Sequence, residues 1–300
     1  MNNEDLCEKA FRECDDSWHL YTPGDLSGII FRTLEEYIFG MNLVALCAAH
    51  FKGLIDIFTF QIMSNHFHFV LQGDKNVVIS FFEELRKRLV RYLSNKNRFS
   101  DLKGFSYSII KIESISYMRN LITYVNRNGY LIDRDSTPFS YTWGGNAYYF
   151  NKQVNDYKQL LLKELSIKKK REIFKTHDIF LPDNYFLING YVSPVCYLNI
   201  ELAEKFFRNA HHYFNLVSRR VESFAQIAKE LGDSISYTDE ELNSAIYYIS
   251  SKKFGTTPKV LTKQQKIEVA KELHFNYNAS VKQIKRVLRL EESILNALFP

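Results

Sequence analysis

The sequence is poor in the features of membrane, disulfide-bonded and low-complexity proteins. Its four cysteines are scattered and lack the spacing of a zinc site, which suits a reducing cytoplasm better than a disulfide framework. Twelve glycines and six prolines are too few for a flexible low-complexity linker. No apolar run approaches the roughly 20 residues of a membrane-spanning helix, and residues 2–5 are polar and acidic, unlike a signal peptide. We therefore expect a soluble cytoplasmic protein with no membrane partner.

The composition is that of a globular protein. Hydrophobic residues make up 46% of the chain, which is enough for a sizeable core. The net charge of +5 is mildly basic, so a nucleic-acid partner is compatible with it but not required. A length of 300 residues favours a catalytic domain with appendages over one large domain.

The order of predicted elements indicates an α+β fold. The pattern is β-α-β-β-α-β-α, in which the second and third strands form a hairpin. This order predicts a ferredoxin-like antiparallel sheet with helices on one face. The expected elements are a strand at 17–22, a helix within 26–51, strands at 55–62 and in the second half of 61–72, a helix at 76–97, a strand at 105–112 and a helix ending near 128–129.

The strand in residues 61–72 carries His66 and His68, one residue apart. On a strand, residues i and i+2 point to the same face, roughly 7 Å apart along the backbone. Two imidazoles placed in this way can converge on one metal ion. Taken alone, the pair is also compatible with two histidines in an ordinary half-buried strand.

A second chemical pattern lies on the last helix of this region. Tyr124 and Asn128 are four residues apart, hence on one helix face, whereas Asn126 points elsewhere. If this helix lies beside the histidine strand, two imidazoles and an amide oxygen can bind a divalent metal next to a phenol. The metal would polarise a phosphodiester and Tyr124 would attack the phosphorus. Ligand softness favours Mn²⁺, and cellular abundance favours Mg²⁺.

The helix at 76–97 and the residues that follow it have a strongly basic face. Such a face can be merely solvated, or it can follow the backbone of DNA if it lies beside a site that handles phosphate. The cations are Arg86, Lys87, Arg88, Arg91, Lys96 and Arg98.

The chain divides into three predicted parts. Residues 1–150 are predicted to form the α+β domain that carries these two chemical patterns, and residues 151–198, with a helix at 151–171, connect it to a helical region at 199–300. Residues 261–298 are compatible with a helix-turn-helix in which Ser280 caps the middle helix. The final segment opens with two glutamates and has no Lys or Arg. This argues against DNA reading by that segment and leaves a small bundle packed on the body as the alternative.

Several segments together resemble a known family. Residues 63–70, Met-Ser-Asn-His-Phe-His-Phe-Val, resemble the His-hydrophobic-His (HUH) motif of single-tyrosine transposases. Residues 124–129 resemble that family's tyrosine-helix motif, and residues 141–148 are similar to the Trp-containing segment of REP-associated tyrosine transposases. Residues 18–22 resemble the family's opening strand, so the likeness covers roughly residues 15–150. Ser64 and Gly129 stand where the family often has proline, which affects loop stiffness more than chemistry.

The resemblance implies an HUH endonuclease fold and a single-stranded DNA endonuclease and strand transferase that acts near hairpins. It implies that His66, His68 and Asn128 bind Mg²⁺ or Mn²⁺ and that Tyr124 is the nucleophile. The basic residues above, together with Arg127, are the predicted contacts to single-stranded or hairpin DNA. Alternatives are a domesticated, non-catalytic hairpin-binding protein, a rolling-circle-type replication initiator and a relaxase. We expect a monomer rather than a homodimer.

Overall fold

The computed structural model describes residues 2–127, 141–156, 160–218, 239–277 and 279–299. Its centre is a four-stranded antiparallel sheet with the strand order β2-β3-β1-β4. The strands expected at 17–22 and 55–62 are confirmed to within one residue, and the fourth strand is shorter than the predicted 105–112. The strands are β1 (Ser17–Tyr21), β2 (Ile55–Ile62), β3 (Phe67–Gly73) and β4 (Ser108–Lys111).

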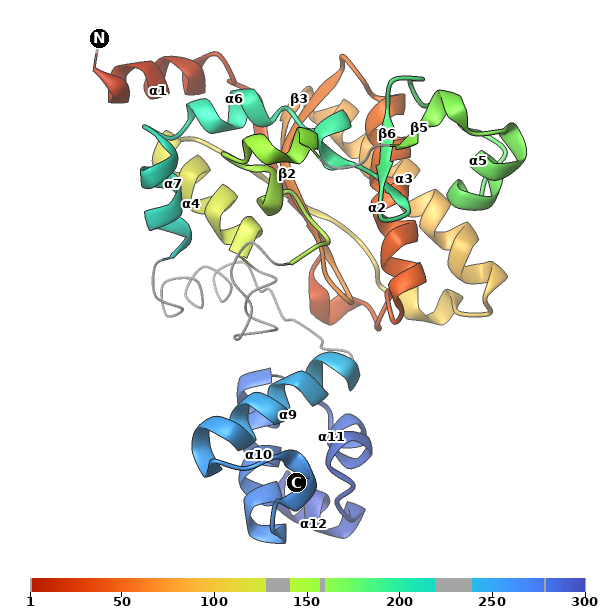
Figure 1. Ribbon diagram of the computed structural model, residues 1–300, viewed down its shortest axis with the longest axis vertical. Coiled ribbons are helices and arrows are strands. Elements are labelled where there is room, and N and C mark those ends of the chain that lie inside the picture. Colours follow the sequence, from red (N-terminus) through yellow and green to blue (C-terminus); the bar gives the residue numbers. More distant parts are fainter. Residues whose placement is uncertain (1, 128–140, 157–159, 219–238, 278, 300) are drawn as a thin grey trace.

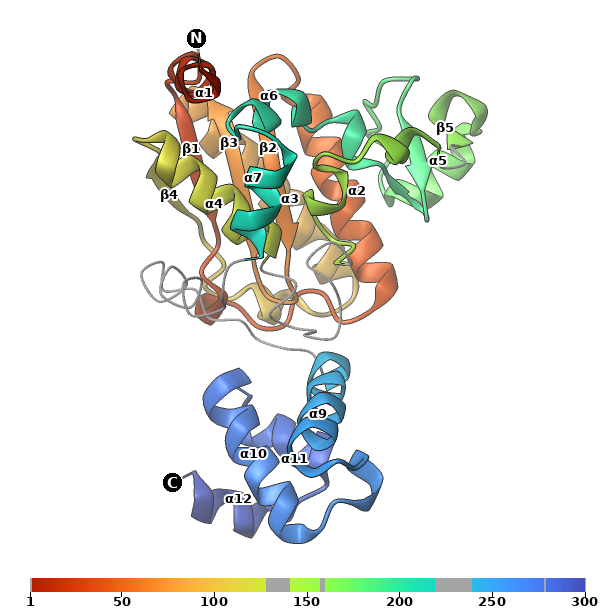
Figure 2. The ribbon, with the colours of Figure 1, turned by 60° about the vertical axis from the view of Figure 1, so that its left-hand side comes forward.

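Helices cover both faces of this sheet (Figures 1 and 2). Phe67 and Phe69 of β3 pack with α2 (Leu34–His50) and α3 (Lys75–Asn95), whereas Val70 packs with α4 (Ile115–Arg127) on the opposite face. The expectation of helices on one face is therefore wrong. The physical reason is that β3 buries side chains on both faces, His68 and Val70 on one and Phe67 and Phe69 on the other, so each face needs a cover of helices.

Helix α4 is fixed between the sheet and an outer layer of helices. The hydroxyl of Ser114 accepts the backbone N–H of Tyr117 at 3.2 Å, which caps the start of α4 as the sequence predicts. On the outer side, the Arg119 guanidinium donates to the carbonyl oxygen of Phe206 and to the carboxylate of Glu4. The outer helices that contact α4 are α1 (Asn3–Arg12) and α7 (Ala210–Val217), whereas α6 (Ile200–Lys205) packs against β2.

The connecting segment departs from its prediction. A single helix over 151–171 is wrong, because the Leu160–Leu161 pair forms a strand, β5, beside β6 (Phe186–Ile188). The helix α5 (Ile167–Phe174) begins only after Ser166, whose hydroxyl accepts the backbone N–H of Lys169. With β7 (Tyr191–Val192), the two strands form a small second sheet next to α2. Long-range pairing thus overrides the local helical pattern.

The C-terminal part is a helical bundle around a separate apolar cluster. Ser280 and Gln283 form a capping box at the start of α11 (Val281–Leu288), so the predicted cap is confirmed. Met63, in the turn between β2 and β3, belongs to the same apolar cluster, so the bundle contacts that turn. Among the helices of the described residues, none combines the length and apolarity that crossing a membrane requires. The bundle helices are α9 (Asp239–Phe254), α10 (Lys263–Tyr277), α11 (Val281–Leu288) and α12 (Glu292–Leu298).

Candidate active site

The two histidines lie on the face of the sheet that α4 covers. His66 directly precedes β3 and His68 is its second residue, so both point away from Phe67. Their ring centroids are 5.0 Å apart and the ring planes are nearly perpendicular, at 89°. Both side chains are fully buried. The predicted pairing of these two imidazoles on one face is confirmed.

Asn65 selects the tautomer of the neutral His66 ring. The side-chain nitrogen of Asn65 donates to the carbonyl oxygen of Gly24 at 2.6 Å, which settles the orientation of the amide. The amide oxygen of Asn65 then faces Nδ1 of His66 at 2.8 Å. Because an amide oxygen can only accept, Nδ1 carries the proton and the lone pair of the neutral ring is on Nε2.

A third buried imidazole, His19 of β1, was missed from the sequence. Its Nε2 lies 3.1 Å from Nδ1 of His68, and the two rings stack at 5.3 Å between centroids. The signal was present in the opening-strand motif. His19 and Tyr21 alternate with the core residues Trp18 and Leu20, so they share the face opposite that core.

Tyr124 lies against His68, as the sequence predicts. The centroid of its ring is 5.7 Å from that of His68, with the rings perpendicular at 88°. The tyrosine is only 1% exposed and belongs to the apolar cluster between the sheet and α4. The phenol is therefore enclosed by protein in this structure. Asn128, the predicted third ligand, lies outside the described residues.

A chain of buried hydrogen bonds anchors α4 beside the histidines. The hydroxyl of Thr59 donates to the side-chain oxygen of Asn126, whose nitrogen donates to the hydroxyl of Tyr213 at 2.8 Å. That hydroxyl donates to the side-chain oxygen of Asn146 at 2.6 Å. Burial raises the pKa of Tyr213 far above the usual range, so its hydroxyl stays protonated and keeps both roles. Asn126 thus points away from the site, as predicted, and sets the position of the helix.

We expect Tyr213→Phe to lower the free energy of unfolding by about 1–3 kcal/mol. The change leaves the side chains of Asn126 and Asn146 buried and each short of one partner. Urea unfolding followed by circular dichroism measures the loss. Tyr247→Phe, at a tyrosine 53% exposed on α9, is the matched control and should be nearly neutral. Equal stability of the two variants would contradict an anchoring role for this hydroxyl.

His66 and His68 can bind a divalent metal ion through the lone pairs of their ring nitrogens. His66 has its Nδ1 engaged by Asn65, and His68 has its Nδ1 engaged by His19, so the Nε2 atoms are the ligand positions. Within residues 2–127, 141–156, 160–218, 239–277 and 279–299, no group of three His, Cys, Asp or Glu side chains is placed to hold a metal. The predicted ligand set contains two histidines and Asn128, so it does not belong to the class of groups that this statement covers.

The basic residues of α3 lie across the sheet from the histidines. Phe81 of α3 packs edge-on against Phe69, on the face opposite His68. The premise that this helix runs beside the histidine site is therefore wrong. Arg88 is bound to Glu84 and to Asp178, at 2.6 and 2.7 Å.

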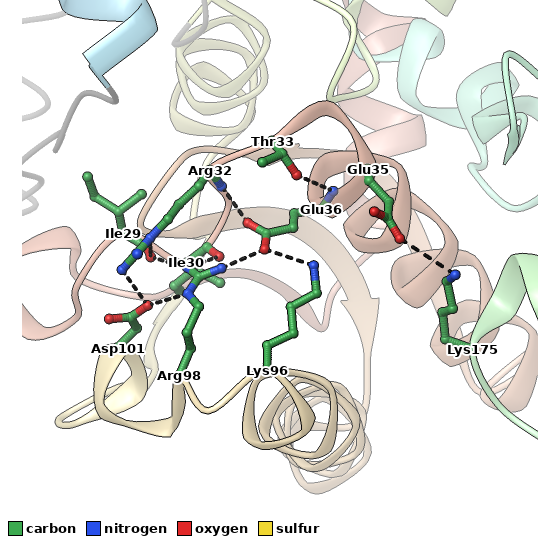
Figure 3. Close-up of polar contacts among 10 residues, drawn as sticks. All are labelled: Ile29, Ile30, Arg32, Thr33, Glu35, Glu36, Lys96, Arg98, Asp101 and Lys175. Atoms are coloured by element: carbon green, nitrogen blue, oxygen red, sulfur yellow. Dashed lines mark hydrogen bonds and ion pairs between the residues drawn. The ribbon is translucent and has the colours of Figure 1, made fainter.

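The other predicted DNA contacts differ in exposure. The Arg86 side chain is half exposed and pairs with Glu83 at 3.0 Å, Lys87 is largely exposed, and Arg91 is exposed. Lys96 and Arg98 both bind the buried carboxylate of Glu36 (Figure 3). Arg127 is buried and donates to the carbonyl oxygen of Val217 at 2.8 Å. DNA binding by these residues stays a prediction, and Arg86, Lys87 and Arg91 are its exposed members on α3.

Comparison of the chain with family models, with curated proteins and with solved structures found no match in any of the three.

Proposed function

We propose that this protein is a metal-dependent single-stranded DNA endonuclease and strand transferase of the HUH single-tyrosine type. The observation that carries the proposal is the contact between Tyr124 and His68, with His66 beside them. The two imidazoles come from a turn and the strand that follows it, and a helix more than 50 residues later brings a phenol to them. A chance tyrosine in a core does not need this arrangement.

The chemistry follows from these side chains. A bound Mg²⁺ or Mn²⁺ would polarise a phosphodiester oxygen and offset the charge of the transition state. The hydroxyl oxygen of Tyr124 forms a bond to phosphorus and loses its proton, while one phosphorus–oxygen bond of the DNA breaks. The departing deoxyribose oxygen takes up a proton. Because the phosphotyrosine keeps the phosphoester bond, a hydroxyl of another strand can reverse the step and join the ends without ATP.

The experiment is a search for the covalent intermediate. The full chain is incubated with single-stranded palindromic segments from the flanks of its own gene and Mn²⁺ or Mg²⁺, and the products are separated in denaturing gels. A labelled adduct of protein and DNA supports the proposal. Hairpin binding without an adduct, across the whole set of segments and both metals, would favour the non-catalytic hairpin-binding protein instead.

His66→Ala is expected to weaken Mn²⁺ binding at least about tenfold and to abolish cleavage, as chelation by EDTA should do in the wild type. The substitution removes one of the two imidazole ligands. Isothermal titration with Mn²⁺ measures the affinity without any DNA. His50→Ala, at an exposed histidine near the end of α2, is the matched control. Unchanged Mn²⁺ affinity in His66→Ala would show that Mn²⁺ does not bind at His66.

A further inference from the structure

We infer that His19 is a positioning residue, which holds His68 in the tautomer that presents Nε2 to the metal. The inference rests on the proposed function for its catalytic meaning, but its geometry stands by itself. His19 is on β1 and His68 is on β3, in neighbouring antiparallel strands. Their nitrogens lie 3.1 Å apart, within hydrogen-bond distance.

The two rings are placed rigidly by the sheet. His19 is opposite Val70 in the register and His68 is opposite Tyr21, so the histidines are diagonal neighbours on one face. Tyr21 stacks on His19 at 4.7 Å between centroids and lies 6.0 Å from His68. Both histidines are fully buried. A half-turn of the His68 ring would keep the stack but would replace Nδ1 with a carbon atom opposite Nε2 of His19, so the hydrogen bond favours the observed orientation.

The proton between the two rings has two possible positions. One nitrogen of the pair must donate and the other must accept, because two lone pairs would repel. If Nδ1 of His68 donates, the lone pair of His68 is on Nε2. In that case His19 accepts through Nε2 and carries its own proton on Nδ1. This arrangement matches His66, whose proton Asn65 already holds on Nδ1.

In this arrangement both imidazoles of the proposed metal site carry the proton on Nδ1, and a different neighbour holds each proton there. The amide oxygen of Asn65 accepts from His66, and Nε2 of His19 accepts from His68. Partners of this kind fix the ring orientation of metal-binding histidines, and losing one typically costs 10–100-fold in affinity. An ordinary core histidine needs a partner too, but its loss would alter packing rather than the tautomer of a neighbour.

The test compares His19→Leu with His19→Gln. Leucine fills space but cannot accept a hydrogen bond, whereas the Gln side-chain oxygen can accept from Nδ1 of His68. We expect His19→Leu to weaken Mn²⁺ binding about 10–100-fold in isothermal titration. His19→Gln should stay close to the wild type. His50→Leu is the matched control, since that histidine is exposed on α2.

Nuclear magnetic resonance of the metal-free protein reads the tautomer directly. Nitrogen-15 shifts should place the proton of His68 on Nδ1 in the wild type and in His19→Gln, and should show its shift toward Nε2 in His19→Leu. A wild-type proton on Nε2 of His68 would overturn the inference, as would equal weakening by Leu and Gln. If the wild type shows the expected tautomer but binds no Mn²⁺, the proposed function fails and the positioning role stands.

Discussion

Replacing Tyr124 with Phe is expected to abolish the covalent adduct and to lower the rate of DNA cleavage by a factor on the order of 10³ or more. The change removes one oxygen atom and keeps the ring that packs against His68. Binding of the hairpin and of Mn²⁺ should therefore be retained, so the loss falls on the chemical step. Denaturing gels with labelled single-stranded DNA measure the adduct, and a filter assay measures the binding.

The matched control for this result lies on the same helix. Tyr117 is seven residues earlier on α4 and is partly buried, so Tyr117→Phe should leave the adduct at the wild-type level. Mass spectrometry of the adduct from the wild type should find the DNA on the peptide that contains Tyr124. An adduct that persists in Tyr124→Phe, on another tyrosine, would show that the nucleophile was assigned wrongly.

The local parts of the candidate site could be predicted from the sequence. The hairpin and the last helix follow from patterns that repeat within a few residues, and the short motifs place the histidines and the tyrosine on those elements. The contact between Tyr124 and His68 then follows from the element order. The role of Asn128 as the third metal ligand stays a prediction, because that residue is outside the described part of the chain.

The long-range parts could not be predicted in the same way. The sequence of β3 does not show which helix covers each of its two buried faces, because this is set by packing of the whole domain. Some of the predicted DNA contacts have partners that are distant in the sequence, whereas Arg86 pairs locally with Glu83. Arg88 binds Asp178, and Arg98 binds Glu36, 62 residues away. Local charge patterns cannot reveal such pairs.

Glu36→Ala is expected to lower the free energy of unfolding by about 3 kcal/mol. One carboxylate oxygen of Glu36 accepts from Arg98 at 2.6 Å and from Lys96 at 3.1 Å, and the other accepts the backbone N–H of Arg32 at 2.7 Å (Figure 3). The carboxylate is buried, so its removal leaves two cations without their shared partner. Urea unfolding followed by circular dichroism measures the loss.

The neighbouring carboxylate supplies the control. Glu35 is exposed and its ion pair with Lys175 is long, at 3.6 Å, so Glu35→Ala should cost less than about 1 kcal/mol (Figure 3). The network around Glu36 is also connected to the turn that carries His66. Arg98 donates to the carbonyl oxygens of Ile29 and Ile30, and the N–H of Ile30 donates to Ser64 in the histidine turn. Similar losses in the two variants would contradict the network.

The pH dependence of stability gives the same network a second test. Burial alone would raise the pKa of Glu36, but the N–H of Arg32 and the cations of Arg98 and Lys96 hold it below its ordinary value of 4.5. A carboxyl with a lowered pKa stabilises the fold fully above the unfolded value, and this contribution falls as the pH drops toward the folded value. The difference in unfolding free energy between the wild type and Glu36→Gln should therefore be constant above about pH 5 and should shrink below pH 4.5. A difference that does not change down to pH 3 would show that the charge of Glu36 contributes nothing and that its shape alone matters.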